Sequence, residues 1–201
     1  MIPAVPEKGS YWGIMGGIFD PIHYGHLILA ESALGAMRFD GILFIPSFNP
    51  PHRKSKPVIS FEDRYRMTLL AIEGHEKFHA SDLEKDLKSP GYTLAIVDFL
   101  RLKYPGVEWC LILGTDNLAQ FDNWHKPEEL INRVKIAAGN RPGTENNESY
   151  SKWINRVEKF DMPLVDISST RIRESIKSGK SVRYLLPEEV RQFILGRGLY
   201  R

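Results

Sequence analysis

Short apolar runs alternate along the chain with stretches in which apolar residues recur every three or four positions. The short runs predict strands, and the periodic stretches predict helices that bury one face. The predicted strands cover residues 11–15, 41–46, 78–83, 108–114, 134–139 and 163–166. The predicted helices cover a segment that ends near 37, then 60–73, 93–104, a segment that begins at 127, and 149–157, 170–177 and 187–195. This alternation is typical of an α/β fold, a doubly wound parallel sheet with helices on both faces.

Local signals agree with several of these boundaries. Ser60 and Asp63 resemble a capping box, Pro127 suits a first helical position, and Pro46 ends an apolar run. Because we find no linker or internal repeat, we predict an N-terminal tail over residues 1–10 and a single domain over 11–201. Its part from about 168 to 201 is predicted to be helical. Ligands of such sheets bind where loops follow the carboxyl ends of strands, so we expect the chemistry there.

Composition narrows the class of protein. The 201 residues include 27 basic and 25 acidic ones, a net charge of +2, which argues against a nucleic-acid partner whose phosphates need a basic surface. The single Cys110 can form neither an internal disulfide nor a thiolate zinc site, which fits a cytoplasmic protein. No apolar run approaches the ~18 residues that span a bilayer, and the N-terminus does not resemble a signal peptide. We therefore expect no membrane partner.

The first candidate loop follows the strand at 11–15 and reads GGIFDPIHYGH over residues 16–26. Glycines after a strand allow backbone amides to approach a phosphate closely. His23 and His26 are three residues apart, a spacing that places both on one face at the start of a helix, near its positive end. Two imidazoles there could hold anionic oxygens.

The second candidate loop reads ISSTRIR over residues 167–173. Ser169 and Thr170 are suitable helix caps, and Arg173 lies one turn into the predicted helix, where it could reach a phosphate at the helix end. Residues 171–201 carry eight Lys and Arg against three Asp and Glu. This local basic excess gives the phosphate site weak support, because charge runs are often only solvated faces.

Together, the two strings resemble the signatures of one family. GGIFDPIHYGH is similar to the GxFDPxHxGH signature of nucleotidylyltransferases, and ISSTRIR resembles their second signature in the form typical of nicotinate-nucleotide adenylyltransferases. Shorter matches follow in the family's order at 50–53 (PPHR), 89–93 (SPGYT), 114–116 with a later Trp, 141–143 (RPG) and 184–187 (YLLP). The resemblance implies a Rossmann-like fold of the HxGH nucleotidyltransferase type with C-terminal helices.

The chain departs from the family pattern at four positions. Ile18 stands where the family usually has Thr, so one hydroxyl contact near the ATP phosphates is lost while the backbone amide remains. Arg53 replaces Lys, Met15 replaces Phe, and Ile96 stands where a second Thr is common.

The resemblance implies transfer of the adenylyl group of ATP to nicotinate mononucleotide (NaMN), which yields nicotinate adenine dinucleotide (NaAD) and pyrophosphate in NAD biosynthesis. The 5′-phosphate of NaMN is already ionised, so the reaction needs alignment and charge neutralisation rather than a strong base. Magnesium would enter with ATP, held mainly by phosphates and not by protein ligands. The sequence does not fix the oligomeric state, so a homo-oligomer stays an open alternative.

The resemblance also implies roles for residues. The residues expected to act on the reacting phosphates are His23, His26 and Arg173. The residues expected to bind ATP are Gly16, Gly17, Ile18, Phe19, His23, His26, Gly114, Asp116, Ser169, Thr170 and Arg173. The residues expected on the NaMN side are His52, Arg53, Thr93, Trp124 and Arg141. Asp20 is expected to brace its loop rather than to react.

Three other functions compete with this one. Residues 75–79 spell HExxH, the motif of zinc peptidases, but that chemistry needs both histidines on one helix, and Gly74 is expected to end the preceding helix. A relative of the same fold could act on phosphopantetheine or nicotinamide mononucleotide; ISSTRIR and the chain length favour nicotinate. A non-catalytic nucleotide sensor would not need His23, His26 and Arg173 together.

Overall fold

The computed structural model describes residues 6–50, 58–87, 91–140 and 152–201. Its sheet consists of β1 (Tyr11–Gly17), β2 (Gly41–Pro46), β3 (Phe78–Ala80), β4 (Glu108–Gly114), β5 (Lys135–Asn140) and β6 (Glu158–Asp161). All described pairings are parallel, and the strand order is β3-β2-β1-β4-β5-β6. This is the order of the doubly wound Rossmann fold, so the predicted fold class is confirmed.

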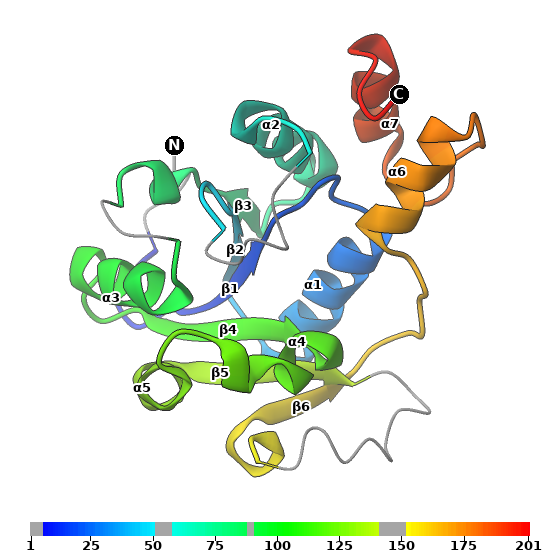
Figure 1. The fold of residues 1–201 in the computed structure, drawn as a ribbon. Coiled ribbons are helices and arrows are strands. Elements are labelled where there is room, and N and C mark those ends of the chain that lie inside the picture. Colours follow the sequence, from blue (N-terminus) through cyan, green and yellow to red (C-terminus); the bar gives the residue numbers. More distant parts are fainter. Residues whose placement is uncertain (1–5, 51–57, 88–90, 141–151) are drawn as a thin grey trace.

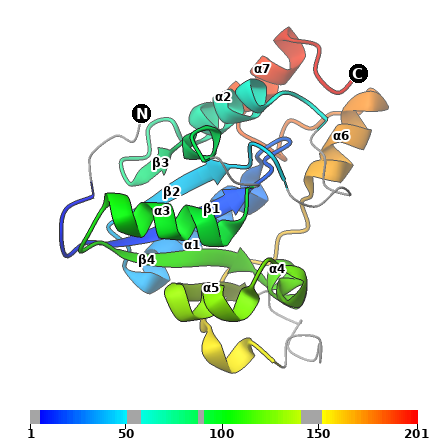
Figure 2. The same ribbon diagram turned by 60° about the vertical axis from the view of Figure 1, so that its left-hand side comes forward.

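Helices cover both faces of the sheet (Figures 1 and 2). They are α1 (Tyr24–Met37), α2 (Phe61–Ile72), α3 (Thr93–Lys103), α4 (Thr115–Ala119), α5 (Pro127–Arg133), α6 (Ser169–Lys177) and α7 (Glu188–Gly196). Short 3-10 turns lie at η2 (Leu83–Lys85), η3 (Phe121–Asn123) and η5 (Ile154–Arg156). Among the described helices, none combines the length and apolar character that a membrane span requires.

Alternation along the strands produces two separate cores. In β1, Met15 points to a core formed with α1, α2, α6 and α7, while Trp12 and Ile14 point to the core formed with α3, α4 and α5. Both faces of the central strands are buried, which explains why their sequences are apolar throughout. The sheet is therefore a rigid support for the loops at its carboxyl edge.

The strand order reverses beside β1. This strand pairs with β2 on one side and with β4 on the other, and Ile14 lies opposite Leu111. The chain moves outward from β1 in one direction through β2 and β3, and in the other through β4. The loops after β1 and β4 therefore diverge and leave space for a ligand between them.

Two predicted elements are wrong. Residues 163–166 do not form a strand; the last strand is β6 at Glu158–Asp161, in which only Phe160 is buried. An edge strand with one buried residue has no apolar run to mark it, whereas exposed Leu164 lies in the connection to α6. The helix predicted at 149–157 is absent from the described residues 152–157, which form only a turn and η5.

Smaller differences concern short elements. The strand predicted at 78–83 ends at Ala80, and η2 follows it. The five-residue helix α4 was not predicted, because one and a half turns offer too few positions for a helical period. The remaining predicted strands and helices are confirmed to within about two residues.

Candidate active site

The loop between β1 and α1 lies at the carboxyl edge of the sheet. Gly17 ends β1, and Phe19 follows with φ +51° and its ring buried. A Cβ at Gly17 would come within 2.7 Å of the Phe19 ring, so this turn requires a glycine. Gly16 is exposed and a Cβ there would meet nothing within 4 Å. Its backbone is therefore open to a ligand.

His23 and His26 lie together at the amino end of α1. His23 is the buried N-cap residue, and the two rings stack with centroids 3.7 Å apart. The His23 backbone N–H donates to Nδ1 of His26 at 3.2 Å. Burial, and then the neighbouring His23, hold the pKa of His26 well below its ordinary value. His26 is thus neutral, and because Nδ1 accepts a hydrogen bond, its proton is on Nε2.

Asp20 holds the loop through its two carboxylate oxygens and its backbone oxygen. The Val58 backbone N–H donates to Oδ2 at 2.6 Å, and the Tyr200 hydroxyl donates to Oδ1 at 2.6 Å. The backbone oxygen of Asp20 accepts from Nη1 of Arg173 at 2.8 Å. Asp20 is buried, and these hydrogen bonds attach the loop to three other segments of the chain.

Arg64 of α2 also holds the loop between β1 and α1. Its fully buried guanidinium donates to the backbone oxygen of Ile18 at 2.6 Å and to that of Ser47 at 2.7 Å. Burial lowers the pKa of Arg64, although the nearby Asp20 opposes the shift. One side chain therefore connects the segments that follow β1 and β2.

Glu84 holds the next part of the β2 loop. Its Oε2 accepts from the Phe48 backbone N–H at 2.7 Å and from the Ser47 hydroxyl at 3.3 Å. Burial raises the pKa of this carboxyl, against the hydrogen bonds that it accepts. These contacts set the direction in which the chain leaves β2.

Helix α6 approaches the loop with its amino end. Its N-cap is Ser168, whose Oγ accepts from the Arg171 backbone N–H at 3.3 Å. This corrects the prediction that Ser169 and Thr170 cap the helix. The Ser169 hydroxyl instead donates to the Pro21 backbone oxygen at 2.8 Å, and Thr170 Oγ1 accepts from Nη2 of Arg173 at 3.2 Å. The first turn of α6 is therefore attached to the β1–α1 loop.

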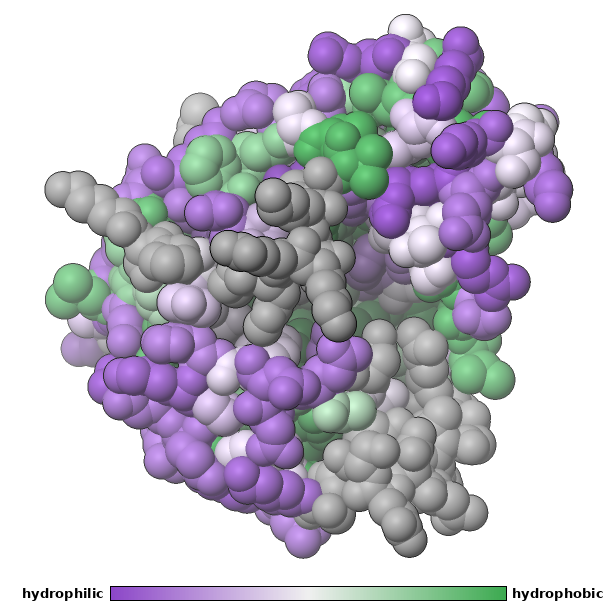
Figure 3. All heavy atoms as spheres, in the orientation of Figure 1, coloured by the Kyte–Doolittle hydropathy of each residue, from purple (hydrophilic) through white to green (hydrophobic). Residues whose placement is uncertain are grey.

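Gly25 of α1 packs closely against the ring of His23 and near the segment that leads into α6. A Cβ at Gly25 would lie 3.0 Å from two atoms of the His23 ring and 3.5 Å from the Ile167 backbone oxygen. Together with the contacts of Ser169 and Arg173 on the loop, this packing places the amino ends of α1 and α6 beside the carboxyl end of β1. Helix amino ends attract anions. The surface is hollowed beside the hydrophilic side chains of α6 (Figure 3).

The residues predicted on the nicotinate side occupy neighbouring loops. Thr93 is the first residue of α3, after Tyr92, and Tyr92 stacks on His125 with centroids 4.0 Å apart. Trp124 is half-buried and packs against Phe121. Thr93 and Trp124 are thus joined through the residues next to them.

The structure describes some of the other predicted site residues and not the rest. Gly114 is the N-cap of α4 at the end of β4, and Asp116 lies in α4. His52, Arg53 and Arg141 lie outside the described residues. The structure therefore unites Gly16–Phe19, His23, His26, Ser169, Thr170 and Arg173 around one loop.

Arg64 and Tyr200 were missed by sequence reasoning. Arg64 occupies a position of the buried stripe of α2, with Phe61, Met67 and Thr68, so a charged residue on an apolar helix face was the available signal. Tyr200 gives no comparable signal, because nothing local distinguishes it from other aromatic residues of a C-terminal segment.

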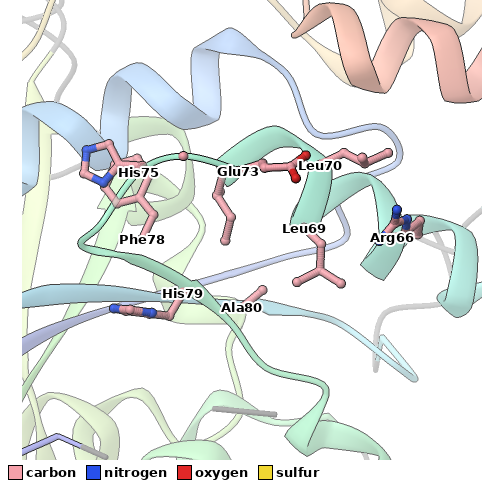
Figure 4. Close-up of a pocket in the computed structure, with 10 residues that line it drawn as sticks. Arg66, Leu69, Leu70, Glu73, His75, Phe78, His79 and Ala80 are labelled. Atoms are coloured by element: carbon pink, nitrogen blue, oxygen red, sulfur yellow. The ribbon is translucent and has the colours of Figure 1, made fainter. Parts of the chain in front are cut away.

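The HExxH string does not form a zinc site. His75 lies in the turn after α2 and pairs with Glu31 at 3.0 Å, whereas His79 lies in β3. The two histidines line a shallow hollow of about 340 Å³ beside the edge strand β3, together with residues of α2 (Figure 4). Within the described ranges, no group of three or more His, Cys, Asp or Glu could hold a metal ion.

Comparisons with known proteins agree on one family. A profile described as cytidylyltransferase-like matches residues 14–175. Proteins of Rubrobacter xylanophilus and Geobacillus thermodenitrificans, both named "Probable nicotinate-nucleotide adenylyltransferase", are 42% and 40% identical over 94% of this chain and over 91% and 85% of their own lengths. The solved structure of Plasmodium falciparum nicotinic acid mononucleotide adenylyltransferase complexed with NaAD has a TM-score of 0.77, at 18% identity over 95% of this chain and 97% of that chain.

Proposed function

Because this chain belongs to the cytidylyltransferase-like family, and within it to the nicotinate-nucleotide adenylyltransferases, we propose that it transfers AMP from ATP to NaMN in NAD biosynthesis. The products are NaAD and pyrophosphate. The observation that carries this proposal is the meeting of His23, His26 and Arg173 at two helix amino ends beside the carboxyl end of β1.

The reaction forms one bond and breaks one. An oxygen of the NaMN 5′-phosphate attacks the α-phosphorus of ATP, and the bond from that phosphorus to the oxygen bridging to the β-phosphate breaks. The leaving pyrophosphate takes the bonding electron pair. Because the attacking oxygen is already ionised, no side chain has to remove a proton. The site therefore acts by aligning two anions and by stabilising the charge that develops.

The residues divide this work. Neutral His26 presents its Nε2–H as a hydrogen-bond donor to a phosphate oxygen at the reacting centre, and the amino end of α1 adds partial positive charge. Arg173 and the amino end of α6 hold the β- and γ-phosphates, where a guanidinium donates in a fixed fork. The backbone of Gly16–Phe19 approaches the nucleotide, and so do Gly114 and Asp116.

We assign NaMN to the residues near the start of α3 and after η3, beside the residues assigned to ATP. Trp124 offers an indole face on which the pyridine ring can stack, and Thr93 offers a hydroxyl and a helix amino end. His52, Arg53 and Arg141, which lie outside the described residues, supply positive or hydrogen-bonding groups to the phosphates or the nicotinate carboxylate.

Magnesium suits this site as an ion carried by ATP. The side chains around the loop are imidazole, hydroxyl and guanidinium groups, and both carboxylate oxygens of Asp20 accept hydrogen bonds. Phosphate oxygens are the ligands that Mg²⁺ prefers, and the ion would neutralise charge on the triphosphate. We further propose a cytoplasmic location, supported by the single cysteine, and no nucleic-acid partner, supported by the net charge of +2.

A product assay tests this function. The purified chain is given ATP and magnesium with NaMN, nicotinamide mononucleotide or phosphopantetheine, and each product is identified by mass. We expect NaAD to form fastest. Product from phosphopantetheine alone would overturn the assignment, and faster formation of the nicotinamide dinucleotide would reverse the substrate preference.

A further inference from the structure

We infer that Tyr200 is a positioning residue for AMP transfer, acting through the carboxylate of Asp20 on the loop that carries His23 and His26. The inference rests on the proposed function. It connects the C-terminal segment after α7 with the loop after β1, 180 residues earlier.

The first argument is the geometry of Asp20. Its two carboxylate oxygens and its backbone oxygen bind three separate segments, namely Tyr200, Val58 and Arg173. Loss of one donor leaves a buried carboxylate oxygen without a hydrogen bond, which costs far more than at an exposed site. The loop would move to recover a partner, and the oxygen that receives Arg173 would move with it. Tyr200 therefore affects both the histidines and the arginine.

The second argument is the state of Tyr200 itself. Its ring is buried in the same core as Ile22 of the loop and Ile172 of α6. Burial and the neighbouring Asp20 raise the pKa of Tyr200, so the hydroxyl remains protonated and can donate.

The third argument is the backbone at Tyr200. It has φ +65°, a left-handed conformation that costs a non-glycine residue about 1–2 kcal/mol. The strained residue is the same one whose hydroxyl donates to Asp20. Such costs are common where a side chain has to be aimed at a functional site.

The test is Tyr200→Phe, which removes one oxygen and keeps the buried ring. We expect kcat to fall about 10- to 100-fold, because displacement of reacting groups by ~1 Å can cost that much. The KM for NaMN should change by less than about threefold, since the nicotinate side is not attached to Asp20. Activity is measured at a temperature at which circular dichroism shows the variant to be folded.

Two controls separate positioning from stability. Tyr11→Phe removes a hydroxyl from a half-buried tyrosine at the amino end of β1, and should leave kcat unchanged. Arg197→Gln breaks the ion pair of Arg197 with Asp63 of α2 (3.3 Å) and loosens the C-terminal segment without contact with Asp20. It should lower the melting temperature slightly and leave kcat within about twofold.

A double variant tests the route through Asp20. If Tyr200 acts only through that carboxylate, Tyr200→Phe combined with Asp20→Asn should be no slower than Asp20→Asn alone. The inference is overturned if kcat of folded Tyr200→Phe stays within about twofold of the parent, if Arg197→Gln falls equally, or if the two effects multiply. A parent chain that makes no NaAD would instead refute the proposed function, so the two failures are distinguishable.

Discussion

Neutral His26 is the residue that we propose to act most directly on the reacting phosphates. Its Nδ1 is occupied by the His23 backbone N–H, so only Nε2–H is available to a phosphate. We predict that His26→Ala lowers kcat by roughly 10²–10³, the usual effect of losing one transition-state donor, while the fold is kept. Steady-state kinetics with ATP and NaMN provide the measurement. His75→Ala, which alters a histidine at the far edge of the sheet, is the control; equal kcat values in the two variants would refute the role.

The depressed pKa of His26 also predicts a pH dependence of stability. Between the folded pKa and the ordinary value of about 6.5, the unfolded chain binds a proton that the folded chain does not. The free energy of unfolding should therefore fall as pH decreases below 6.5 and reach its full value above it. Urea unfolding of the parent and of His26→Gln at pH 8.0 and 5.5 measures this effect. The parent should lose more stability than the variant on acidification; equal losses would contradict the depressed pKa.

Arg64 is a structural charge whose loss should be costly. Arg64→Met keeps much of the volume but leaves the backbone oxygens of Ile18 and Ser47 without their donor. Each buried unsatisfied group costs about 1–3 kcal/mol, so we predict a loss of about 2–5 kcal/mol in the free energy of unfolding. Urea titration measures it. Arg66→Met, on the exposed side of the same helix, should change stability by less than about 0.5 kcal/mol; similar losses in both would show that the contacts of Arg64 contribute little.

Two glycines of α1 allow a matched experiment at the scale of an element. Gly25→Ala would press a methyl group against the His23 ring, whereas Gly35→Ala meets nothing within 4 Å. We predict that Gly25→Ala lowers kcat/KM about tenfold or more by displacing the imidazole. Gly35→Ala should leave activity unchanged and add about 0.5–1 kcal/mol of stability, because alanine favours a helix interior. Unchanged activity in Gly25→Ala would mean that the His23 ring can shift without loss of activity.

The length of an element decided how well the sequence predicted it. β2 is a continuous apolar run and β4 is apolar after its exposed first residue, Glu108; both are buried on both faces, and their bounds were predicted correctly. β6 offers one buried residue and α4 only five residues, and neither provides a period to detect. The neighbours of β1 could not be read from periodicity, because pairing across the sheet is a long-range property.

The same contrast applies to the site. The strings at 16–26 and 167–173 are contiguous, so local reasoning placed both at the starts of helices. The residues that support them come from α2 and from the segment after α7, and only folding brings them together. The capping residue was misplaced by one position, because three adjacent hydroxyl residues, Ser168, Ser169 and Thr170, are all acceptable caps.

At the scale of the whole molecule, ATP should stabilise the fold by binding between distant segments. The loop after β1 and helix α6 contact each other directly, so a ligand held by both opposes global unfolding. At ATP concentrations 100-fold above Kd, we predict a gain of about 2.7 kcal/mol in the free energy of unfolding, measured by thermal unfolding with and without magnesium and ATP. Arg173→Ala should remove most of this gain, and a full gain in that variant would place the triphosphate elsewhere.

The bonds from Asp20 to Arg173 and Tyr200 have a consequence for protein synthesis. Their partners are 153 and 180 residues further along the chain. At 5–20 residues per second, the ribosome needs roughly 9–36 s to reach Tyr200 after it has added Asp20. A nascent chain can pair its first strands during that time, but Arg173 and Tyr200 are not yet present to hold Asp20. On the roles proposed for Arg173 and Tyr200, a translation product that stops before residue 173 should make little NaAD even when its sheet has formed.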